Sequence, residues 1–489
     1  MAPRYQDLRD WLDQVDQMGE LRIIRGAHWD KEMGALAEMI YHRHGFSAPA
    51  LLFDDVPGYP SGYRVLIGAL GSPRRLALTV GMELGEYRTL VDVVKAYRAW
   101  SDKRREFKLL EPVEVSDGPI LENVLTGDQV DLLKFPVPLL HELDGGRYIG
   151  TADAVLTRDP DDGWVNAGTY RVQVIDRQRT FIYITPGKQG RIHMEKWFAR
   201  GQPCPVVIVC GGDPVLFWVG GSQVQSGVSE LAYAGALKGE PLEVIRGEFT
   251  GLPIPARAEI ALEGFIMPDE RGIEGPFGEW PGYYAGSDQP EPVVRIQAIY
   301  HRNDPILLAA GSHKPPHGHS LLKCLSGAVR LWEQLEKADV PGVVGVWSHP
   351  AGGGRSFVVI AIRQMYHGHS RQVGLLASQL HPASYGGRWI VVVDDDIDPS
   401  NLEEVVWAMS TRCDPAVDLE VIHRCWSSKI DPLTDKERRI WLNNRVIVDA
   451  TIPFEKRDTF PKVVQSSPEL RRKIYEKWRD ALPDLLDGK

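Results

Sequence analysis

Two glutamates lie five residues apart, Glu274 and Glu279, in the segment EGPFGEWPGYY. The glycines and the proline between them predict a tight backbone, and the aromatic residues of the segment are expected to form an apolar wall beside the carboxyl groups. A carboxyl group that loses its water against aromatic rings has a raised pKa and can donate a proton near neutral pH. The alternative interpretation is an acidic turn in contact with solvent. The four aromatic residues are Phe277, Trp280, Tyr283 and Tyr284.

A second candidate for chemistry is Arg171, in the segment WVNAGTYRVQVI. A planar guanidinium can hold a carboxylate through two parallel hydrogen bonds, a task for which it is better suited than lysine. Strict strand alternation would place Asn166 and Arg171 on opposite faces, whereas a bend at Gly168 would bring them together. The alternative role of Arg171 is a cross-strand ion pair on the surface of a sheet.

Candidate metal ligands occur in further segments. Six histidines fall in two loose groups, one around the segment SHKPPHGHS, but no HExxH motif or cysteine pair completes a zinc site. A loop on the surface or beside a pocket is the simpler interpretation. The run Asp394, Asp395 and Asp396 follows a buried strand and could hold Mg2+, although its position before a helix N-terminus explains it equally well. The six histidines are His301, His313, His317, His319, His367 and His369.

The whole chain has the composition of a folded globular protein. Its 489 residues exceed the roughly 250 to 300 at which one core stops growing, so two or three domains are expected. The net charge of -10 and the lack of Lys/Arg clusters argue against nucleic-acid binding. Five cysteines without a CxxC pair indicate neither a disulfide framework nor a zinc ribbon. We therefore expect a cytoplasmic protein, and the absence of a long apolar run predicts no membrane span.

The elements that must position the candidate residues change in character along the chain. An amphipathic helix is expected over YQDLRDWLDQVDQM, and a domain boundary is placed near residues 105 to 118. From about 119 to 310, strand-like segments predict a largely antiparallel sheet or barrel with one or two helices inserted. After about 320, helices and buried strands alternate as in an α/β layer domain. A last amphipathic helix, capped by Ser467 and Pro468, must dock on another surface, for which a partner subunit is one candidate.

Seven segments occur in one order along nearly the whole chain, and in this order the chain resembles the UbiD-type family of reversible decarboxylases that use prenylated FMN. The segments are DLRDWLDQVDQMGEL, NAGTYRVQV, RIHMEKW with VVIVCGGDP, SELAYAGALKGEPLEV, IEGPFGEWPGYY, VVVDDDIDPSNLEEVVWAMSTR, and SSKIDP with VIVDAT. The resemblance implies a multidomain α/β and α+β fold. Its parts are an N-terminal α/β domain (1–115), a central split β-barrel that binds the flavin (116–318), a C-terminal α/β oligomerisation domain (319–460) and a C-terminal helix (461–489).

The resemblance also implies an active site. Arg171 would hold the substrate carboxylate, Glu274 would hold Arg171, and Glu279 would protonate the carbon left after CO2 departs. Thr169 and Tyr170, which precede Arg171, would contact the cofactor.

The same resemblance implies cofactors and their ligands. Besides prenylated FMN, a divalent metal, Mn2+ or Mg2+, would bridge the protein to the flavin phosphate, with K+ alongside. The implied ligands are Asn166, His193 and Glu230. An amide oxygen, an imidazole and a carboxylate suit Mn2+ better than zinc, and the metal offsets the charge of the phosphate.

Two features depart from the family pattern. A lysine that reaches the flavin in parts of the family is replaced here by Arg388, so either Arg388 makes that contact or the contact is absent. The segment SHKPPHGHS is not constant in the family either, and His313 or His317 would hydrogen-bond a polar substituent of the substrate.

The predicted reaction is the reversible, non-oxidative loss of CO2 from an aromatic, heteroaromatic or α,β-unsaturated carboxylic acid. Expected partners are this acid, CO2, a flavin prenyltransferase that supplies the cofactor, and further copies of the chain in a homo-dimer or homo-hexamer. The alternatives are a non-catalytic scaffold that keeps the fold, or a metal-dependent hydrolase that uses the Asp394–Asp396 or His313–His319 loops.

Overall fold

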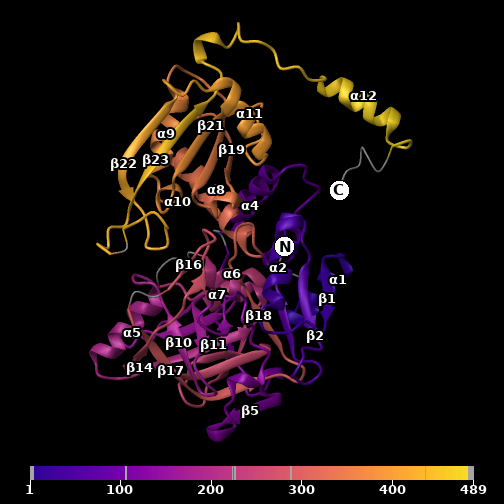
Figure 1. The fold of residues 1–489 in the computed structure, drawn as a ribbon. Helices are drawn as coiled ribbons and strands as arrows, with labels where there is room; N and C mark the ends of the chain where they lie inside the picture. Colours follow the sequence, from indigo (N-terminus) through magenta and orange to yellow (C-terminus); the bar gives the residue numbers. More distant parts are fainter. Residues whose placement is uncertain are drawn as a thin grey trace.

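The computed structural model describes residues 5–104, 107–222, 224, 227–286, 289–435 and 437–482. Figure 1 shows a C-terminal α/β layer at one end of the molecule and the N-terminal and central parts at the other. The largest hydrophobic core is continuous through all three parts, since it contains Trp11, Trp218 and Trp347. The fold is therefore a multidomain α/β and α+β structure whose parts share one core.

The N-terminal part is a four-stranded sheet in the order β1-β2-β3-β18, so a strand from far along the chain completes it. Its strands are β1 (Leu21–Arg25), β2 (Ala50–Asp54), β3 (Arg64–Ile67) and β18 (Ile306–Ala309). Its helices are α1 (Leu8–Gln17), α2 (Glu32–His44), α3 (Pro73–Val80) and α4 (Leu90–Arg104). Strand β18 falls within the range predicted for the central domain (116–318) but pairs in the N-terminal sheet. The N-terminal sheet is therefore not built from one continuous stretch of sequence, and the domain boundaries stay a prediction.

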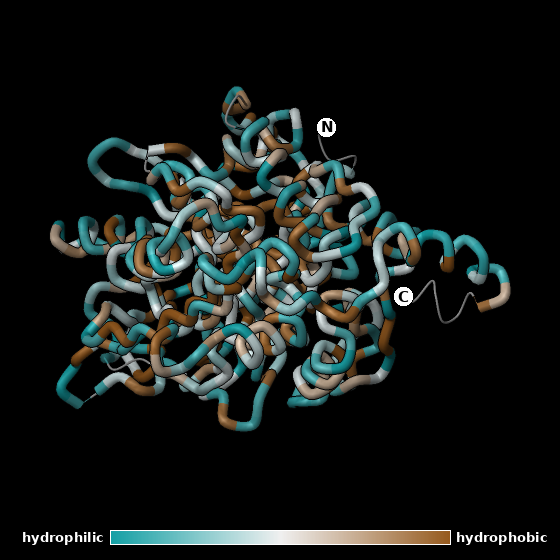
Figure 2. Tube along the Cα trace, turned by 90° about the horizontal axis from the view of Figure 1, so that it is seen from above, coloured by the Kyte–Doolittle hydropathy of each residue, from teal (hydrophilic) through white to brown (hydrophobic). Residues whose placement is uncertain are grey.

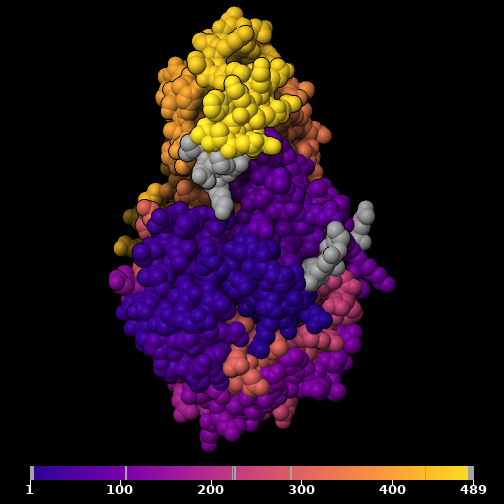
Figure 3. Space-filling model, turned by 90° about the vertical axis from the view of Figure 1, so that its right-hand side faces the viewer, coloured from indigo at the N-terminus to yellow at the C-terminus, as the bar shows by residue number. Residues whose placement is uncertain are grey.

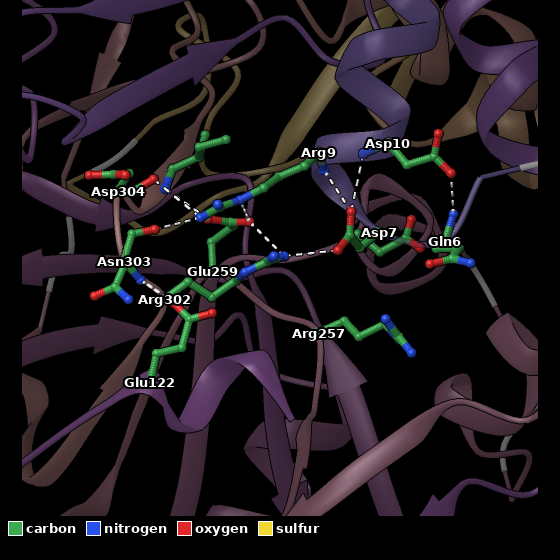
Figure 4. A network of polar contacts seen from close by, with 12 residues as sticks. Gln6, Asp7, Arg9, Asp10, Glu122, Arg257, Glu259, Arg302, Asn303 and Asp304 are labelled. Atoms are coloured by element: carbon green, nitrogen blue, oxygen red, sulfur yellow. Dashed lines mark hydrogen bonds and ion pairs between the residues drawn. The ribbon is translucent and has the colours of Figure 1, made fainter. Parts of the chain in front are cut away.

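Helix α1 is the amphipathic helix expected from the sequence. Asp7 caps it by accepting hydrogen bonds from the backbone N–H groups of Arg9 and Asp10. A network of ion pairs then ties its start to the central sheet (Figure 4): Arg9 donates to both oxygens of Glu259 at 2.8 and 2.9 Å, and Arg302 donates to Asp7 at 2.8 Å. Figure 3 shows the N-terminal residues, in indigo, spread over one side of the molecule.

The central part is built on a nine-stranded sheet in the order β6-β9-β10-β17-β14-β11-β7-β8, with β5 paired to β17, and every one of these pairs is antiparallel. Its strands are β5 (Asn123–Thr126), β6 (Tyr148–Gly150), β7 (Ala154–Arg158), β8 (Val165–Gly168), β9 (Arg171–Val174), β10 (Arg179–Tyr183), β11 (Cys204–Gly211), β14 (Ile260–Gly272) and β17 (Glu291–His301). The helices α5 (Gln189–Ala199), α6 (Pro214–Gly221) and α7 (Glu230–Lys238) accompany the sheet, one more than expected.

The segment expected as one strand, WVNAGTYRVQVI, is two strands. β8 lies at one edge of the sheet and β9 next to the other edge, although only Thr169 and Tyr170 separate them. A link of this length spans at most about 11 Å, so the sheet must curl until its edges approach each other. The curl makes a half-barrel, and it places the candidate residues of β8 and β9 at its seam.

The shorter elements are two small sheets and several single-turn helices. The sheets contain β4 (Val113–Glu114), β12 (Glu243–Arg246) and β13 (Pro253–Pro255), and β15 (Phe277–Gly278) with β16 (Tyr284–Ala285). The 3-10 helices are η1 (Gly45–Ser47), η2 (Pro119–Glu122), η3 (Gly127–Gln129), η4 (Leu132–Lys134), η5 (Pro350–Gly352) and η6 (Phe454–Lys456).

The C-terminal part is a five-stranded sheet in the order β19-β20-β21-β23-β22, in which β20, β21 and β23 run parallel. Its strands are β19 (Val343–Ser348), β20 (Phe357–Ile362), β21 (Trp389–Asp394), β22 (Leu419–Trp426) and β23 (Leu442–Ala450), and its helices are α8 (Ser320–Lys337), α9 (His369–Gln379), α10 (His381–Ser384) and α11 (Leu402–Arg412). Helix α8 packs against β19 and α4 and so joins this part to the rest.

Helix α12 (Pro468–Trp478) is the expected C-terminal helix, capped by Ser467. It stands away from the body in Figures 1 and 2, and every residue from 461 to 482 is exposed. The face with Leu470, Ile474 and Trp478 therefore buries nothing within the described chain. Among the described helices, none combines the length and apolar character needed to cross a membrane.

Candidate active site

The two glutamates are carried by a small hairpin in which β15 pairs with β16. Its backbone requires glycine at two positions. Gly275 has a φ of +85°, in the left-handed region, and a Cβ on Gly278 would lie 2.1 Å from the carbonyl oxygen of Ser312. The tight backbone expected from the glycines is confirmed. Along the chain it places Glu274 before the strand β15 and Glu279 directly after it.

Arg171 joins the two glutamates. Its Nε and Nη2 donate to the two carboxylate oxygens of Glu274 at 2.7 and 2.9 Å, and its Nη1 donates to Glu279 Oε1. The side chain of Glu274 is fully buried, that of Arg171 is 9% exposed and that of Glu279 is 18% exposed. Arg171, 103 and 108 positions before the two glutamates, thus forms one charged centre with them, and Glu279 is its solvent-facing member.

The surroundings keep Arg171 charged and hold it in place. Burial by itself lowers the pKa of the Arg171 guanidinium, but the charges of Glu274 and Glu279 outweigh it and raise that pKa. The guanidinium stacks over the ring of Tyr183, with 4.3 Å between Arg171 Cζ and the ring centroid. Arg171 therefore stays a cation at any physiological pH.

Two residues that the sequence did not single out support the centre. Tyr148 donates from its hydroxyl to Glu274 Oε1 at 2.8 Å, and burial together with Glu274 raises the pKa of that hydroxyl. Gln173 donates to the carbonyl of Gly145 and accepts from the backbone N–H of Gly275, both at 2.8 Å. Tyr148 and Gln173 are register partners across β6 and β9, so the sheet itself positions the hairpin. The signal in the sequence was that Gln173 shares a strand face with Arg171.

The apolar wall expected beside the glutamates is only half present. Phe277 and Trp280 are buried, and Phe277 packs against Tyr148 with 4.3 Å between ring centroids. Tyr283 and Tyr284 are 59% and 38% exposed. The expectation for these two tyrosines was wrong.

A cleft of about 860 Å³ opens beside the charged centre and is lined by residues of the central and C-terminal parts and of helix α4. Arg171, Glu279, Thr169 and Tyr170 line its central side. Thr169 donates from its hydroxyl to the backbone carbonyl of Asp153 at 2.9 Å, which holds the link between β8 and β9 in place. The volume is sufficient for a large cofactor together with a small substrate.

Asn166 and Glu230 are brought together behind this link. Glu230, the first residue of α7, accepts from the backbone N–H of Ala167 at 2.9 Å. With the amide of Asn166 oriented to satisfy its neighbours, its nitrogen lies 3.3 Å from Glu230 Oε1. Burial raises the pKa of Glu230 to about 7. An amide and a carboxylate side by side are a partial ligand set for a hard cation.

His193, the third predicted ligand, lies next to Thr157, and Thr157 in turn lies opposite Asn166 in the sheet. Its Nδ1 is 3.1 Å from the hydroxyl of Thr157, which is the register partner of Asn166, and its Nε2 is 3.8 Å from Asp159. Burial lowers the pKa of His193, so the ring is neutral and able to coordinate a metal. Nε2 has no hydrogen-bond partner in the part of the chain that the structure describes.

The histidine loop reaches the cleft through His319, which was not predicted as a pocket residue. His319 lies 3.1 Å from Ser312 through Nε2 and Oγ, and both residues line the cleft. His313 instead packs against Tyr41 and His42, and His317 is buried; neither of them is among the cleft residues.

The remaining candidates are engaged in ion pairs. Arg388 donates to both oxygens of Asp431 at 2.8 Å and does not line the cleft. Asp394 and Asp396 both bind Arg412, and Asp395 pairs with Arg363. Across the described ranges, no group of three or more His, Cys, Asp or Glu residues forms a metal site. Arginine side chains therefore occupy the carboxylates that the hydrolase alternative would use in the Asp394–Asp396 loop.

Comparison with protein families finds three matches in sequence order. The 3-octaprenyl-4-hydroxybenzoate carboxy-lyase (UbiD) models match as the N-terminal domain over residues 12–94, the Rift-related domain over 111–315 and the C-terminal domain over 320–450. The match covers most of the chain, including every residue of the charged centre.

Individual relatives and structures agree with these matches. The chain is 30% identical to a pyrrole-2-carboxylic acid decarboxylase of Pseudomonas aeruginosa (97% of this chain, 98% of that protein) and 32% identical to a phenolic acid decarboxylase of Sedimentibacter hydroxybenzoicus (99% of each). The structure is similar to vanillic acid decarboxylase of S. hydroxybenzoicus in its open form, with a TM-score of 0.84 at 29% identity over 98% and 99% of the two chains. It is also similar to the UbiD-class enzyme HmfF of Pelotomaculum thermopropionicum in complex with FMN, with a TM-score of 0.83 at 29% identity over 96% and 98%.

Proposed function

Because this chain belongs to the UbiD family and is a carboxy-lyase, we propose that it removes CO2, reversibly and without oxidation, from an aromatic, heteroaromatic or α,β-unsaturated carboxylic acid with the help of prenylated FMN. The observation that carries the proposal is the contact of Arg171 with both Glu274 and Glu279 at the wall of a large cleft.

Each residue of the centre has a separate role in this proposal. Glu274 holds Arg171 through two hydrogen bonds and keeps its orientation. The carboxylate of the substrate takes the place of Glu279 on Nη1 of Arg171. When the carbon–carbon bond to CO2 breaks, its electron pair stays on the substrate carbon, and Glu279 donates the proton that this carbon needs. Glu279 is paired with Arg171 before the substrate binds, so it takes up this proton from solvent once the substrate carboxylate has displaced it. Glu279 is the solvent-facing residue of the three, so solvent also returns a proton to it after each turnover.

The cofactor would fill the cleft beside this centre. Prenylated FMN supplies the electron sink, which no side chain provides. Support comes from HmfF, whose structures are described in complex with FMN and with prFMN. In this chain Thr169 and Tyr170 would contact the flavin, and Arg388 could reach it only after leaving Asp431.

A divalent cation, Mn2+ or Mg2+, would be held by Asn166, His193 and Glu230, with K+ nearby. The donor set fits, because Asn166 and Glu230 offer oxygen and His193 offers an unpaired ring nitrogen close by. A bound metal would keep Glu230 ionised.

Further proposals concern the partners of the chain. A flavin prenyltransferase would supply the cofactor. The C-terminal α/β part would mediate a homo-dimer or homo-hexamer, and the unpacked apolar face of α12 supports association with another copy. One HmfF variant is described as an evolved dimeric form.

The test uses the full chain co-expressed with a flavin prenyltransferase. It should carry a flavin-like absorbance and bound Mn, and it should exchange hydrogen for deuterium at the product carbon when arenes are screened in D2O. Protein expressed without the prenyltransferase is the control and should not exchange. A cofactor-loaded chain that neither exchanges nor releases CO2 from any acid of the panel would contradict the proposal.

A further inference from the structure

Three basic side chains line the cleft on its C-terminal side: Lys323 and Arg330 from helix α8, and Arg355 from the loop between η5 and β20. Lys323 and Arg330 are seven residues apart, which places them on one face of the helix. All three are half-buried. We call Lys323, Arg330 and Arg355 the α8 cluster.

The positive charge of the α8 cluster is not balanced by a direct contact with an acidic side chain. Within the described ranges, none of the three side chains has a hydrogen bond or an ion pair within 4.0 Å, and the Nε of Arg355 is buried without a partner. Arg355 is held by aromatic contacts instead, with 5.4 Å between its Cζ and the ring centroid of Tyr385.

The acidic side chains that line the cleft do not balance the charge of the α8 cluster. The lining contains two carboxylates, Glu279 and Glu333, against six Lys and Arg side chains. Glu279 is bound to Arg171, and Glu333 lies at the far end of the cluster, where it acts on Arg330. The six basic residues are Arg104, Arg171, Lys188, Lys323, Arg330 and Arg355.

The mutual effect of these charges is visible in their protonation. Burial and the charge of Arg355 lower the pKa of Lys323 to about 8. Burial, Arg355 and Arg330 lower the pKa of Lys188 at the mouth of the cleft. Like charges held together in a partly dry cleft are unfavourable unless an anion joins them.

We propose that the α8 cluster binds a second anionic group of the substrate, so that the enzyme acts on an acid with a further carboxylate or phosphate besides the carboxylate that leaves. The inference rests on the proposed decarboxylation and narrows its substrate class. It differs from what the names of the relatives state, since pyrrole-2-carboxylic acid and vanillic acid carry one carboxylate each. The other source of the same chemistry is the phosphate of the flavin.

The test measures binding, which does not depend on turnover. The full chain is loaded with FMN, and calorimetry compares terephthalate with benzoate, 4-carboxycinnamate with cinnamate, and biphenyl-4,4′-dicarboxylate with biphenyl-4-carboxylate. At least one diacid should bind ten times more tightly than its monoacid, as a charge-assisted contact gives. R355Q and R330Q should remove most of this preference, R355K should keep it, and R363Q, an exposed arginine of the same part, should leave it unchanged.

A second arm identifies the source of the anion. The cofactor-free chain is titrated with FMN and with riboflavin, and R355Q should leave the preference for FMN within about twofold. If R355Q and R330Q abolish the FMN preference while the diacid ratio stays the same, the cluster belongs to the cofactor phosphate and the inference is wrong. It is also wrong if no diacid binds better than its monoacid. An enzyme that decarboxylates monoacids without any diacid preference would refute the inference and leave the proposed function standing.

Discussion

Two groups of basic side chains face the same cleft and differ in how their charge is balanced. Arg171 meets two carboxylates, one of them fully buried, whereas Lys323, Arg330 and Arg355 meet none within ion-pair distance among the described residues. A cation that is paired before the substrate arrives is pre-organised, and it releases one partner when the substrate binds. A group of unpaired cations destabilises the ligand-free chain through the repulsion between its charges. An anionic ligand removes this repulsion when it binds, which strengthens binding.

The largest loss of stability and activity is expected when Arg171 is removed. R171A leaves the buried Glu274 without its counter-ion, which costs about 3–5 kcal/mol of stability. The melting temperature should fall sharply, and decarboxylation should fall by a factor on the order of 10³ or more, since substrate can no longer be held. R171K is the control for charge: it should recover part of the stability and little of the activity, because lysine cannot make the two-pronged contact. Unchanged stability in R171A would contradict the pairing.

The support of the centre is tested next by Q173A. This change removes the bonds to the carbonyl of Gly145 and to the N–H of Gly275, so we expect a loss of about 1–3 kcal/mol in stability. Because Gly275 follows Glu274, kcat should fall about tenfold while KM changes less. The matched control is Q178A, whose exposed side chain binds the carbonyl of Gly127. Equal effects of the two changes would show that Gln173 has no positioning role.

In the α8 cluster, removing a charge is expected to raise the stability of the chain, whereas in the charged centre it lowers it. R355Q removes one of several neighbouring like charges, so the ligand-free chain should become more stable, by up to about 1 kcal/mol. The melting temperature should therefore rise in R355Q and fall in R171A. High salt should reduce the effect of R355Q, because it screens partly exposed charges. A destabilised R355Q would mean that Arg355 has a partner in solution.

The smallest expected effect is a change in the affinity for a diacid with pH. Lys323 faces Arg355, Glu279 and Cys324, and its pKa is lowered to about 8, chiefly by burial and by Arg355. Its positive charge is present at pH 7 and is lost as the pH rises through 8, so the affinity for a diacid should fall by a factor on the order of 3 to 10 between pH 7 and 9. K323R, which stays charged, should abolish this slope. A steeper slope in K323R than in the wild-type chain would exclude Lys323 as its origin.

Much of the architecture could be predicted from local patterns. The helices α1 and α12 begin close to where apolar spacing and capping residues predicted them, because caps and periodicity act over a few residues. A bend at Gly168 was one of the two alternatives for this segment, and β8 does end there. That the chain passes at this point from one edge of a curled sheet to the other could not be predicted, since such a passage has no local signature.

The site divides in the same way. The resemblance named Arg171, Glu274 and Glu279 before their contacts were known, and the structure brings them together. The roles of Tyr148 and Gln173 follow from the register between β6 and β9, which alternation cannot specify for strands far apart in sequence. The α8 cluster needs Arg355 beside a helix that begins 35 residues earlier, which only the packed fold reveals.

The most direct test of the account follows the proton that Glu279 is proposed to deliver. In D2O, the cofactor-loaded E279Q chain is compared with the wild-type chain for the rate of deuterium incorporation at the product carbon and for the Kd of the acid. The account predicts that exchange falls by a factor on the order of 10³ while the Kd stays within a few-fold, because glutamine preserves shape and loses the proton. Exchange in E279Q at the wild-type rate would contradict the assignment of Glu279 as the acid.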